Sequence, residues 1–269
     1  MNTINILRPK VFILAALMSF SCSQAEEPGE DDIQQKPGWQ LIWSDDFDYP
    51  DPDLDKNWIA QNGPSGHILC SRWRENAVVE NGLLYLKNKK ENRGGQEWTS
   101  ASIWTKKQFQ YGRFECRYKY AAATGTNNSF WMMTTGYTPT AGKKFEIDIN
   151  EGHYPSEMAT NLHNWTDVTT DPVSGKSTHP SSSQSFNFDA SQSGMNLANE
   201  FHIYSLEWSK DSLIYSFDGK MMRRLKNDIC HSPAPVYLSE AIISWAGAVT
   251  DAIDGTSMVV DWVKIYQKN

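Results

Sequence analysis

From residue 39 onward, polar and apolar positions alternate in short runs that are separated by turn residues. Alternation with a period of two is typical of strands that have one buried face. Asn81-Gly82 and Asp218-Gly219 lie between such runs, and both are typical of tight hairpin turns. The clearest predicted strands cover residues 83–86, 111–120, 201–208, 213–217 and 258–266.

Helical patterns are confined to residues 197–200 and to parts of 221–230. Many short strands with Gly, Asn and Asp turns predict an all-β fold, a curved antiparallel β-sandwich or jelly roll. The chain shows no internal repeat. We therefore expect a single domain over residues 39–269.

The N-terminal segment has the composition of an export signal. Arg8 and Lys10 precede the apolar run 11–17, which is too short to span a membrane and is followed by small residues up to Cys22. We predict a signal peptide of the lipoprotein type over residues 1–21, with Cys22 lipidated. An ordinary signal peptide cut nearby is the alternative. The expected location is therefore the outer membrane, at the cell surface.

Residues 22–38 are polar and acidic, with too little apolar surface to fold, and we interpret them as a flexible tether. An acidic stretch directly after a lipidated cysteine resembles the surface-export signal of Bacteroidetes lipoproteins.

Composition narrows the range of partners. The chain has 32 Asp and Glu against 25 Lys and Arg and no basic stripe, so nucleic acid is not expected as a partner. Eleven Trp and eleven Tyr supply a large aromatic core, a cleft that stacks on sugar rings, or both.

Apart from Cys22, the cysteines are Cys70, Cys116 and Cys230, so at most one disulfide forms; Cys116 is expected to be a buried free thiol. No Cys/His cluster predicts zinc.

Residues 145–153 read Phe-Glu-Ile-Asp-Ile-Asn-Glu-Gly-His and hold three acids in an apolar stretch. In a strand, Glu146 and Asp148 project from the same face, and one β-bulge returns Glu151 to that face. Ile147 and Ile149 then point into the core. Crowded carboxylates raise the pKa of at least one member, which suits glycoside cleavage by a nucleophile and a protonated acid. A solvated acidic strand edge is the alternative interpretation.

The order of motifs around this strand resembles glycoside hydrolase family 16, which includes laminarinases, lichenases, agarases, porphyranases and κ-carrageenases. The resemblance covers nearly all of residues 39–269, and its E-x-D-x-x-E form is similar to the laminarinase and marine-galactanase branches. The segments that carry it are Trp39–Phe47, Asn81-Gly82-Leu83, Thr99–Ile103 leading to Tyr111–Glu115, Phe130-Trp131-Met132, Glu207-Trp208 and Val260–Val263.

That resemblance implies a jelly roll with a concave substrate cleft and a retaining, double-displacement mechanism. It makes Glu146 the nucleophile, Glu151 the general acid/base and Asp148 an assisting residue that shares a proton or hydrogen bond with the nucleophile. No cofactor is required for this chemistry. Retention requires the two working carboxyl groups to lie about 5–5.5 Å apart, so their side chains must converge.

Nine residues are candidates for substrate binding. By the resemblance, Trp131 is the first choice for stacking on a sugar, while Trp73 and Trp245 match cleft aromatics. Arginine suits planar oxyanions, although an exposed salt bridge is an alternative for each arginine. The histidines alternatively satisfy local hydrogen bonds. The full set is Trp131, Trp73, Arg72, Arg74, Trp98, His153, His163, Trp165 and Trp245.

A departure from the laminarinase pattern bears on the substrate. Laminarinases usually carry Pro-Ala before the Phe-Trp-Met motif, and this chain has Asn127-Asn128-Ser129 there. We therefore expect an endo-acting monomer that cleaves a red-algal galactan of the agarose or porphyran type. The alternatives are an endo-β-1,3-glucanase, a host-glycan endo-β-galactosidase and a non-catalytic glycan-binding lipoprotein.

The resemblance also implies a structural calcium site on the convex face. Asp261 and the Gly82 carbonyl match its positions, and Asp46 is a further candidate ligand, because Ca²⁺ is bound by oxygen atoms.

Overall fold

The computed structural model describes residues 37–134, 139–188 and 194–269. The predicted signal peptide (1–21), Cys22 and the predicted tether up to residue 36 lie outside the described residues. The described residues belong to one compact unit, Lys36–Asn269.

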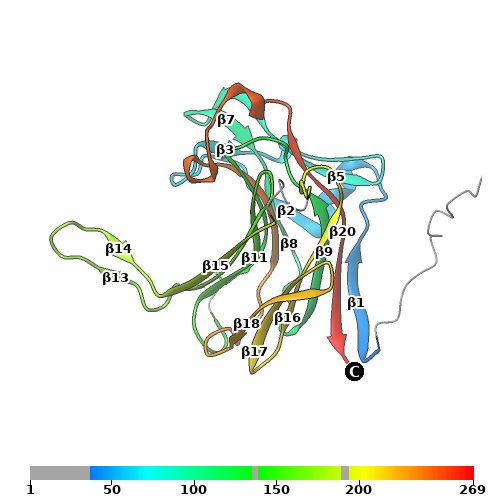
Figure 1. Ribbon diagram of the computed structural model, residues 1–269, viewed down its shortest axis with the longest axis vertical. Helices are drawn as coiled ribbons and strands as arrows, with labels where there is room; N and C mark the ends of the chain where they lie inside the picture. The colour runs from blue at the N-terminus through cyan, green and yellow to red at the C-terminus, as the bar shows by residue number, and fades with distance from the viewer. Residues whose placement is uncertain (1–36, 135–138, 189–193) are drawn as a thin grey trace, which may run out of the picture. The chain divides into compact units, whose positions relative to one another are not determined.

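Within the described residues, two large antiparallel sheets face each other as a sandwich (Figure 1). The eight-stranded sheet has the order β18-β17-β16-β9-β20-β5-β4, and β1 also pairs with β20. Its strands are β1 (Trp39–Asp45), β4 (Ala77–Glu80), β5 (Leu83–Lys87), β9 (Gly112–Lys119), β16 (His202–Trp208), β17 (Ser212–Phe217), β18 (Lys220–Lys226) and β20 (Ser257–Lys268).

The seven-stranded sheet has the order β15-β12-β11-β10-β19-β8-β2 and carries the acidic stretch on β11. Its strands are β2 (Trp58–Ala60), β8 (Ser102–Thr105), β10 (Thr126–Met133), β11 (Phe145–His153), β12 (Glu157–Asn164), β15 (Ser181–Asn187) and β19 (Val236–Ile242).

Two smaller sheets complete the described strands. β3 (Cys70–Arg72) runs parallel to β7 (Gln96–Ser100), which also pairs with β6 (Lys89–Arg93). β13 (Thr169–Thr170) and β14 (Ser177–Thr178) form a hairpin that extends away from the sandwich (Figure 1). We call residues 166–180 the arm.

The described helical segments are short. They are α1 (Leu54–Asn57) and the 3₁₀ turns Asp51–Asp53, Arg74–Asn76, Ser244–Ala246 and Asp251–Ile253. Helices of this size and composition, in the part of the chain that the structure describes, cannot cross a membrane.

The five strands predicted from alternation are confirmed as β5, β9, β16, β17 and β20. Both hairpin turns are confirmed as well. Asn81 and Gly82 have φ values of 54° and 72°, and Asp218 and Gly219 have φ values of 46° and 77°. Two consecutive residues with positive φ form the turn whose twist matches that of paired strands.

Both helix predictions are wrong. Residues 197–199 form a turn whose Leu197 carbonyl accepts a hydrogen bond from the Tyr120 amide. Lys220–Lys226 is the strand β18, because pairing with β17 outweighs local helix preference.

The main apolar cluster fills the space between the sheets. Ile147 and Ile149 of β11 are fully buried there, as the alternation predicted. Cys116 is a buried free thiol, and so are Cys70 and Cys230, so the disulfide that the sequence allowed is not formed.

Candidate active site

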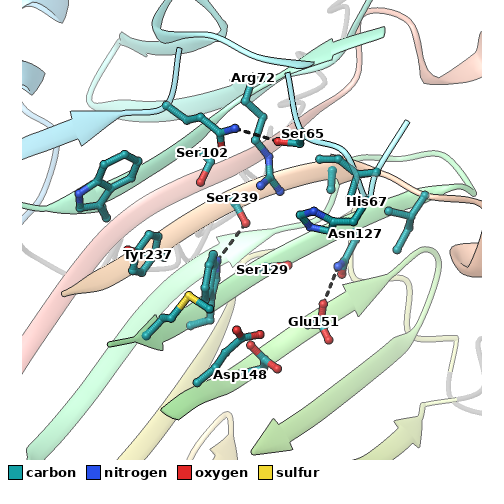
Figure 2. A pocket seen from close by; sticks show the side chains of 18 of the residues that line it. Ser65, His67, Arg72, Ser102, Asn127, Ser129, Asp148, Glu151, Tyr237 and Ser239 are labelled. Atoms are coloured by element: carbon teal, nitrogen blue, oxygen red, sulfur yellow. Dashed lines mark hydrogen bonds between the residues drawn. The ribbon is translucent and has the colours of Figure 1, made fainter. Parts of the chain in front are cut away.

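A cleft of about 590 Å³ lies on the seven-stranded sheet. Side chains from β8, β10, β11, β12 and β19 form its floor, and residues 61–68 together with Ile243 and Trp245 complete its wall. Figure 2 shows polar groups from several of these strands pointing into the same space. The curvature of the sheet therefore gathers residues that are far apart in the sequence.

The predicted bulge in β11 is present. Opposite β10, Trp131 pairs with Asp148 and Phe130 pairs with Asn150, so Ile149 is passed over. Opposite β12, the register shifts between Asp148 and Glu151. As a result Glu146, Asp148 and Glu151 all line the cleft. Because Asp148 is only 2% exposed, the solvated acidic edge is excluded.

Asn150 occupies the interior side of the bulge. It is fully buried, and its amide donates hydrogen bonds to the hydroxyls of Tyr118 (2.6 Å) and Tyr120 (2.8 Å). A buried amide requires such partners, and these two tyrosines fix the bulged backbone from beneath. The sequence analysis did not single out Asn150, because its partners come from another sheet.

Two asparagine amides hold Glu151. Asn127 Nδ2 donates to Oε1 at 2.8 Å, and Asn161 Nδ2 donates to Oε2 at 2.6 Å. The departure from the laminarinase pattern at residues 127–129 therefore includes a direct contact with a carboxylate of β11. Its neighbour Asn128 has a structural role, since it bonds the Ala121 amide and the Gly152 carbonyl.

Glu146, which is half-buried, and Asp148, which is buried, have different partners. Trp165 Nε1 donates to Glu146 Oε2 at 2.9 Å, and His163 Nε2 lies 3.2 Å from Asp148 Oδ2. The His163 contact is close but not aligned as a hydrogen bond. Catalytic hydrogen bonds are often loose in the unliganded state and tighten on substrate binding.

Burial is the main influence on both pKa values. Burial, and then the neighbouring Asp148, raises the pKa of Glu146 to about 8. Burial, and then the charge of Glu151, raises the pKa of Asp148 well above its usual range. Glu146 and Asp148 therefore share one proton over the range in which the pair titrates.

Five of the nine predicted substrate residues line the cleft: Trp131, Arg72, His163, Trp165 and Trp245. Trp131 stacks on Tyr237 with ring centroids 4.2 Å apart, and its indole N–H donates to Ser239 Oγ. Trp245 is 63% exposed, so it is not a core residue. An exposed indole beside a polar cleft suits the apolar face of a sugar.

The other four predicted substrate residues do not line the cleft. Trp98 is 4% exposed and packs in the second apolar cluster, because the parallel pairing of β7 with β3 turns it inward. Arg74 forms ion pairs with Asp51 and Asp55. Trp73 is covered by the guanidinium of Arg93, 3.8 Å from the ring centroid. His153 Nδ1 lies 3.2 Å from a carboxylate oxygen of Glu157, its cross-strand partner on β12.

Sequence reasoning missed several residues of the site. They are Asn127 and Asn161 on Glu151, Tyr237 beneath Trp131, His67 in the wall, and His179, which contacts both His163 and Trp165. Their positions depend on strand pairing over long sequence distances. The Asn127-Asn128 departure was the available signal for the first of them.

The calcium prediction is not supported by the arrangement of its residues. Arg117 already contacts the Asp261 carboxylate, and Lys264 Nζ lies 3.8 Å from Asp46. A cation at each carboxylate reduces its attraction for Ca²⁺. Calcium at these positions stays a prediction.

The fold and site define a glycoside hydrolase, and comparisons with known proteins agree. Residues 67–264 match the model for glycosyl hydrolases family 16. The chain therefore belongs to this family of retaining glycoside hydrolases, and it is an endo-acting β-glycanase.

Relatives differ in the substrates that their names state. A beta-glucanase of Rhodothermus marinus is 28% identical over 97% of this chain and 95% of its own length. A kappa-carrageenase of Pseudoalteromonas carrageenovora is 25% identical over 100% of this chain and 75% of its own. The crystal structure of SCLam, a non-specific endo-beta-1,3(4)-glucanase, superposes with a TM-score of 0.68 at 29% identity, covering 86% of this chain and 92% of that one.

Proposed function

We propose that Glu146 is the nucleophile, that Glu151 is the general acid/base and that Asp148 assists Glu146. The observation that carries this assignment is the convergence of three carboxyl groups on one cleft, each with different hydrogen-bonding partners. A retaining glycosidase needs one carboxylate to attack the anomeric carbon and one acid to protonate the leaving oxygen.

The environments of the acids support these roles. The proton that Asp148 shares with Glu146 is able to form a hydrogen bond between them, and Trp165 donates a second one to Glu146. Both hydrogen bonds stabilise the ionised nucleophile and orient it. Glu151 is held by two neutral amides, so it is free to exchange a proton with the leaving group and then with water.

Two substrates are candidates for this site. Most of the relatives above are β-glucanases by name, and they favour a β-1,3-glucan. A red-algal galactan such as agarose or porphyran is favoured by the carrageenase relative and by Asn127 in place of the laminarinase sequence. The host-glycan alternative belongs to the second class, since it also involves β-galactosides.

The first experiment is a measurement of new reducing ends on agarose, porphyran, laminarin and a mixed-linkage glucan. Catalysis by the proposed site requires that Glu146→Gln reduce turnover by at least about a thousandfold while polymer binding is kept. Glu80→Gln is the matched control, because Glu80 is exposed at the end of β4. Unchanged turnover in Glu146→Gln would contradict the assignment.

The same experiment decides the non-catalytic alternative. A glycan-binding lipoprotein would bind one of the polymers and release no reducing ends from any of them. The complete set of three acids favours the enzyme, because a binding protein has no need of a carboxyl pair with raised pKa values.

We also propose that the chain is an outer-membrane lipoprotein, anchored through Cys22 and exposed at the cell surface by an acidic tether. The basis is the N-terminal sequence alone. Cys22→Ser is expected to abolish incorporation of labelled fatty acid and to release the protein from the membrane fraction. Proteinase added to intact cells is expected to degrade the wild-type protein.

A further inference from the structure

The cleft contains a buried cation that the proposed catalytic roles do not use. Arg72 is 8% exposed and lines the cleft. Its backbone exchanges two hydrogen bonds with Gly63, and its Nε donates to the Glu240 carbonyl at 3.3 Å. Figure 2 shows the guanidinium extending toward the middle of the cleft, beside His67 and Ser239.

Arg72 is a buried arginine without an ion-pair partner among the described residues. Within that part of the chain Arg223 also lacks a carboxylate, but its NH groups donate to oxygens of Thr160 and Ser182. Among the described residues, no Asp or Glu oxygen lies within 4.0 Å of the Arg72 nitrogens, whereas Arg113 pairs with both Glu115 and Glu207. Glu240 does not compensate for it, because its side chain lies on the other side of β19 and accepts from Asn88 Nδ2. Burial also raises the pKa of Glu240 well above its usual range, and the charge of Arg72 opposes this only in part.

An uncompensated buried charge is costly, by several kcal/mol in general, so the fold is expected to hold it for a partner. The Nε of Arg72 is occupied by the Glu240 carbonyl, which leaves its two terminal NH₂ groups directed at the cleft. Such a pair of donors matches the oxygens of a sulfate or a carboxylate. A neutral sugar hydroxyl would not balance the charge.

The surroundings give this group a position along the cleft. Ser65, His67 and Ile68 line the cleft beside Arg72. Burial, and then the charge of Arg72, lowers the pKa of His67, so its ring is neutral and able to donate one hydrogen bond. Of the three acids on β11, Glu151 is the one whose charge affects the pKa values of both His67 and Arg72. Trp165, which bonds Glu146, lies toward the other end of the cleft.

We propose that Arg72 forms an anion-binding subsite at the Glu151 end of the cleft, and that the substrate is a polysaccharide bearing a sulfate ester or a carboxylate on a sugar bound there. This inference rests on the proposed function and narrows its substrate class. It favours a charged polymer over laminarin and over neutral agarose.

The test compares charged and neutral forms of one backbone. The polymers are porphyran, chemically desulfated porphyran, agarose and carboxymethyl agarose, incubated with the full chain. We expect the ratio of kcat/KM for a charged polymer to that for its neutral form to fall at least about tenfold in Arg72→Gln, because hydrogen bonds to charged groups are strong. Preference for porphyran or for carboxymethyl agarose then distinguishes sulfate from carboxylate.

Two further variants serve as controls. Arg72→Lys keeps the charge and is expected to keep part of the preference, while Arg74→Gln, which alters an arginine outside the cleft, is expected to leave it unchanged. Thermal unfolding checks that Arg72→Gln is folded. An equal loss on charged and neutral polymers, or no loss on either, would overturn the subsite.

Binding to the inactive Glu146→Gln protein separates the two proposals. Arg72-dependent binding of a charged polymer without cleavage by the wild type would keep the subsite and reject the catalytic function. Cleavage of neutral polymers alone, unaffected by Arg72→Gln, would keep the function and reject the subsite. Neither binding nor cleavage of any polymer would reject both.

Discussion

Glu146 is the candidate nucleophile, and its surroundings disfavour its ionised form. Burial and Asp148 raise its pKa to about 8, while the Trp165 N–H acts in the opposite direction by stabilising the anion. The carboxyl group must be ionised to attack. Below pH 8 a growing fraction of the free enzyme therefore carries the proton and is inactive.

We therefore predict that kcat/KM increases as the pH is raised from 6 toward 8. In Trp165→Phe, which keeps an aromatic ring but lacks the N–H, this rise of kcat/KM is expected to occur at higher pH, because the Glu146 carboxylate loses a hydrogen-bond donor. The measurement is kcat/KM against pH for both proteins. Trp104→Phe is a control, since Trp104 lines the cleft but stacks on Tyr237, away from the acids. An identical pH dependence of kcat/KM in wild type and Trp165→Phe would contradict this account.

At the scale of elements, β11 depends on close contact between its bulge and the opposite sheet. A Cβ added at Gly152 would lie 2.2 Å from the Tyr120 ring, and that ring also binds Asn150. Tyr120 is nearly fully buried and stacks with Tyr118 and Tyr204, so its ring has little freedom to shift. Only glycine therefore fits after Glu151.

Gly152→Ala is expected to destabilise the fold by about 1–3 kcal/mol, as overpacking usually does, and to lower kcat by displacing Glu151. The measurements are urea unfolding and turnover on the substrate found in the panel. Gly66→Ala is the matched control, because a Cβ there meets no atom within 4 Å and the φ of Gly66 is not left-handed. Equal stability of the two variants would show that Tyr120 can move.

The arm contacts the partners of Glu146 and Asp148 through His179. Its ring packs on Trp165 with centroids 3.7 Å apart, and its Nε2 lies 2.9 Å from His163 Nδ1. Trp165 bonds Glu146 and His163 contacts Asp148, so His179 is a positioning residue for both partners.

We predict that His179→Ala lowers kcat about tenfold with little change in KM or in thermal stability, because the arm is exposed while the acids it positions act in the chemical step. Thr178→Ala, in the same hairpin, removes a hydrogen bond to Thr169 that does not reach the site, and is expected to be neutral. If both variants lose the same activity, the arm acts as a whole and not through His179.

The elements differ in how far the sequence determines them. The bulge in β11 was predictable because Glu146, Asp148 and Glu151 share a face only if one residue is added, and Ile147 and Ile149 require a core. Faces within one strand follow from period-two alternation.

Pairing between distant strands does not follow from alternation. Trp98 was misplaced because its neighbour β3 runs parallel to β7, a pairing that no local pattern reveals. For the same reason Asn161, Tyr237 and His179 were not predicted. Each of them contacts a predicted site residue, namely Glu151, Trp131 and His163 respectively. The sequence therefore predicts which residues share a face of one strand, but not which distant strands bring their residues together in the site.

At the scale of the whole molecule, packing between the sheets takes the place of covalent cross-links. Cys70, Cys116 and Cys230 are buried free thiols in a chain whose N-terminal sequence predicts export. Burial raises the pKa of each thiol, so little reactive thiolate is present in the folded state. The core between the sheets therefore supplies the stability that small secreted domains draw from disulfides.

This leads to a prediction for the Cys22→Ser chain, in which those three thiols are the only cysteines. A thiol reagent added to the native protein is expected to label none of them within the time in which it labels all three in denaturant. A reductant is expected to leave the melting temperature unchanged, because no disulfide contributes to the folded state. Loss of stability in reductant, or fewer than three labelled thiols after unfolding, would mean that a disulfide forms during export and that the packing described here is not the sole source of stability.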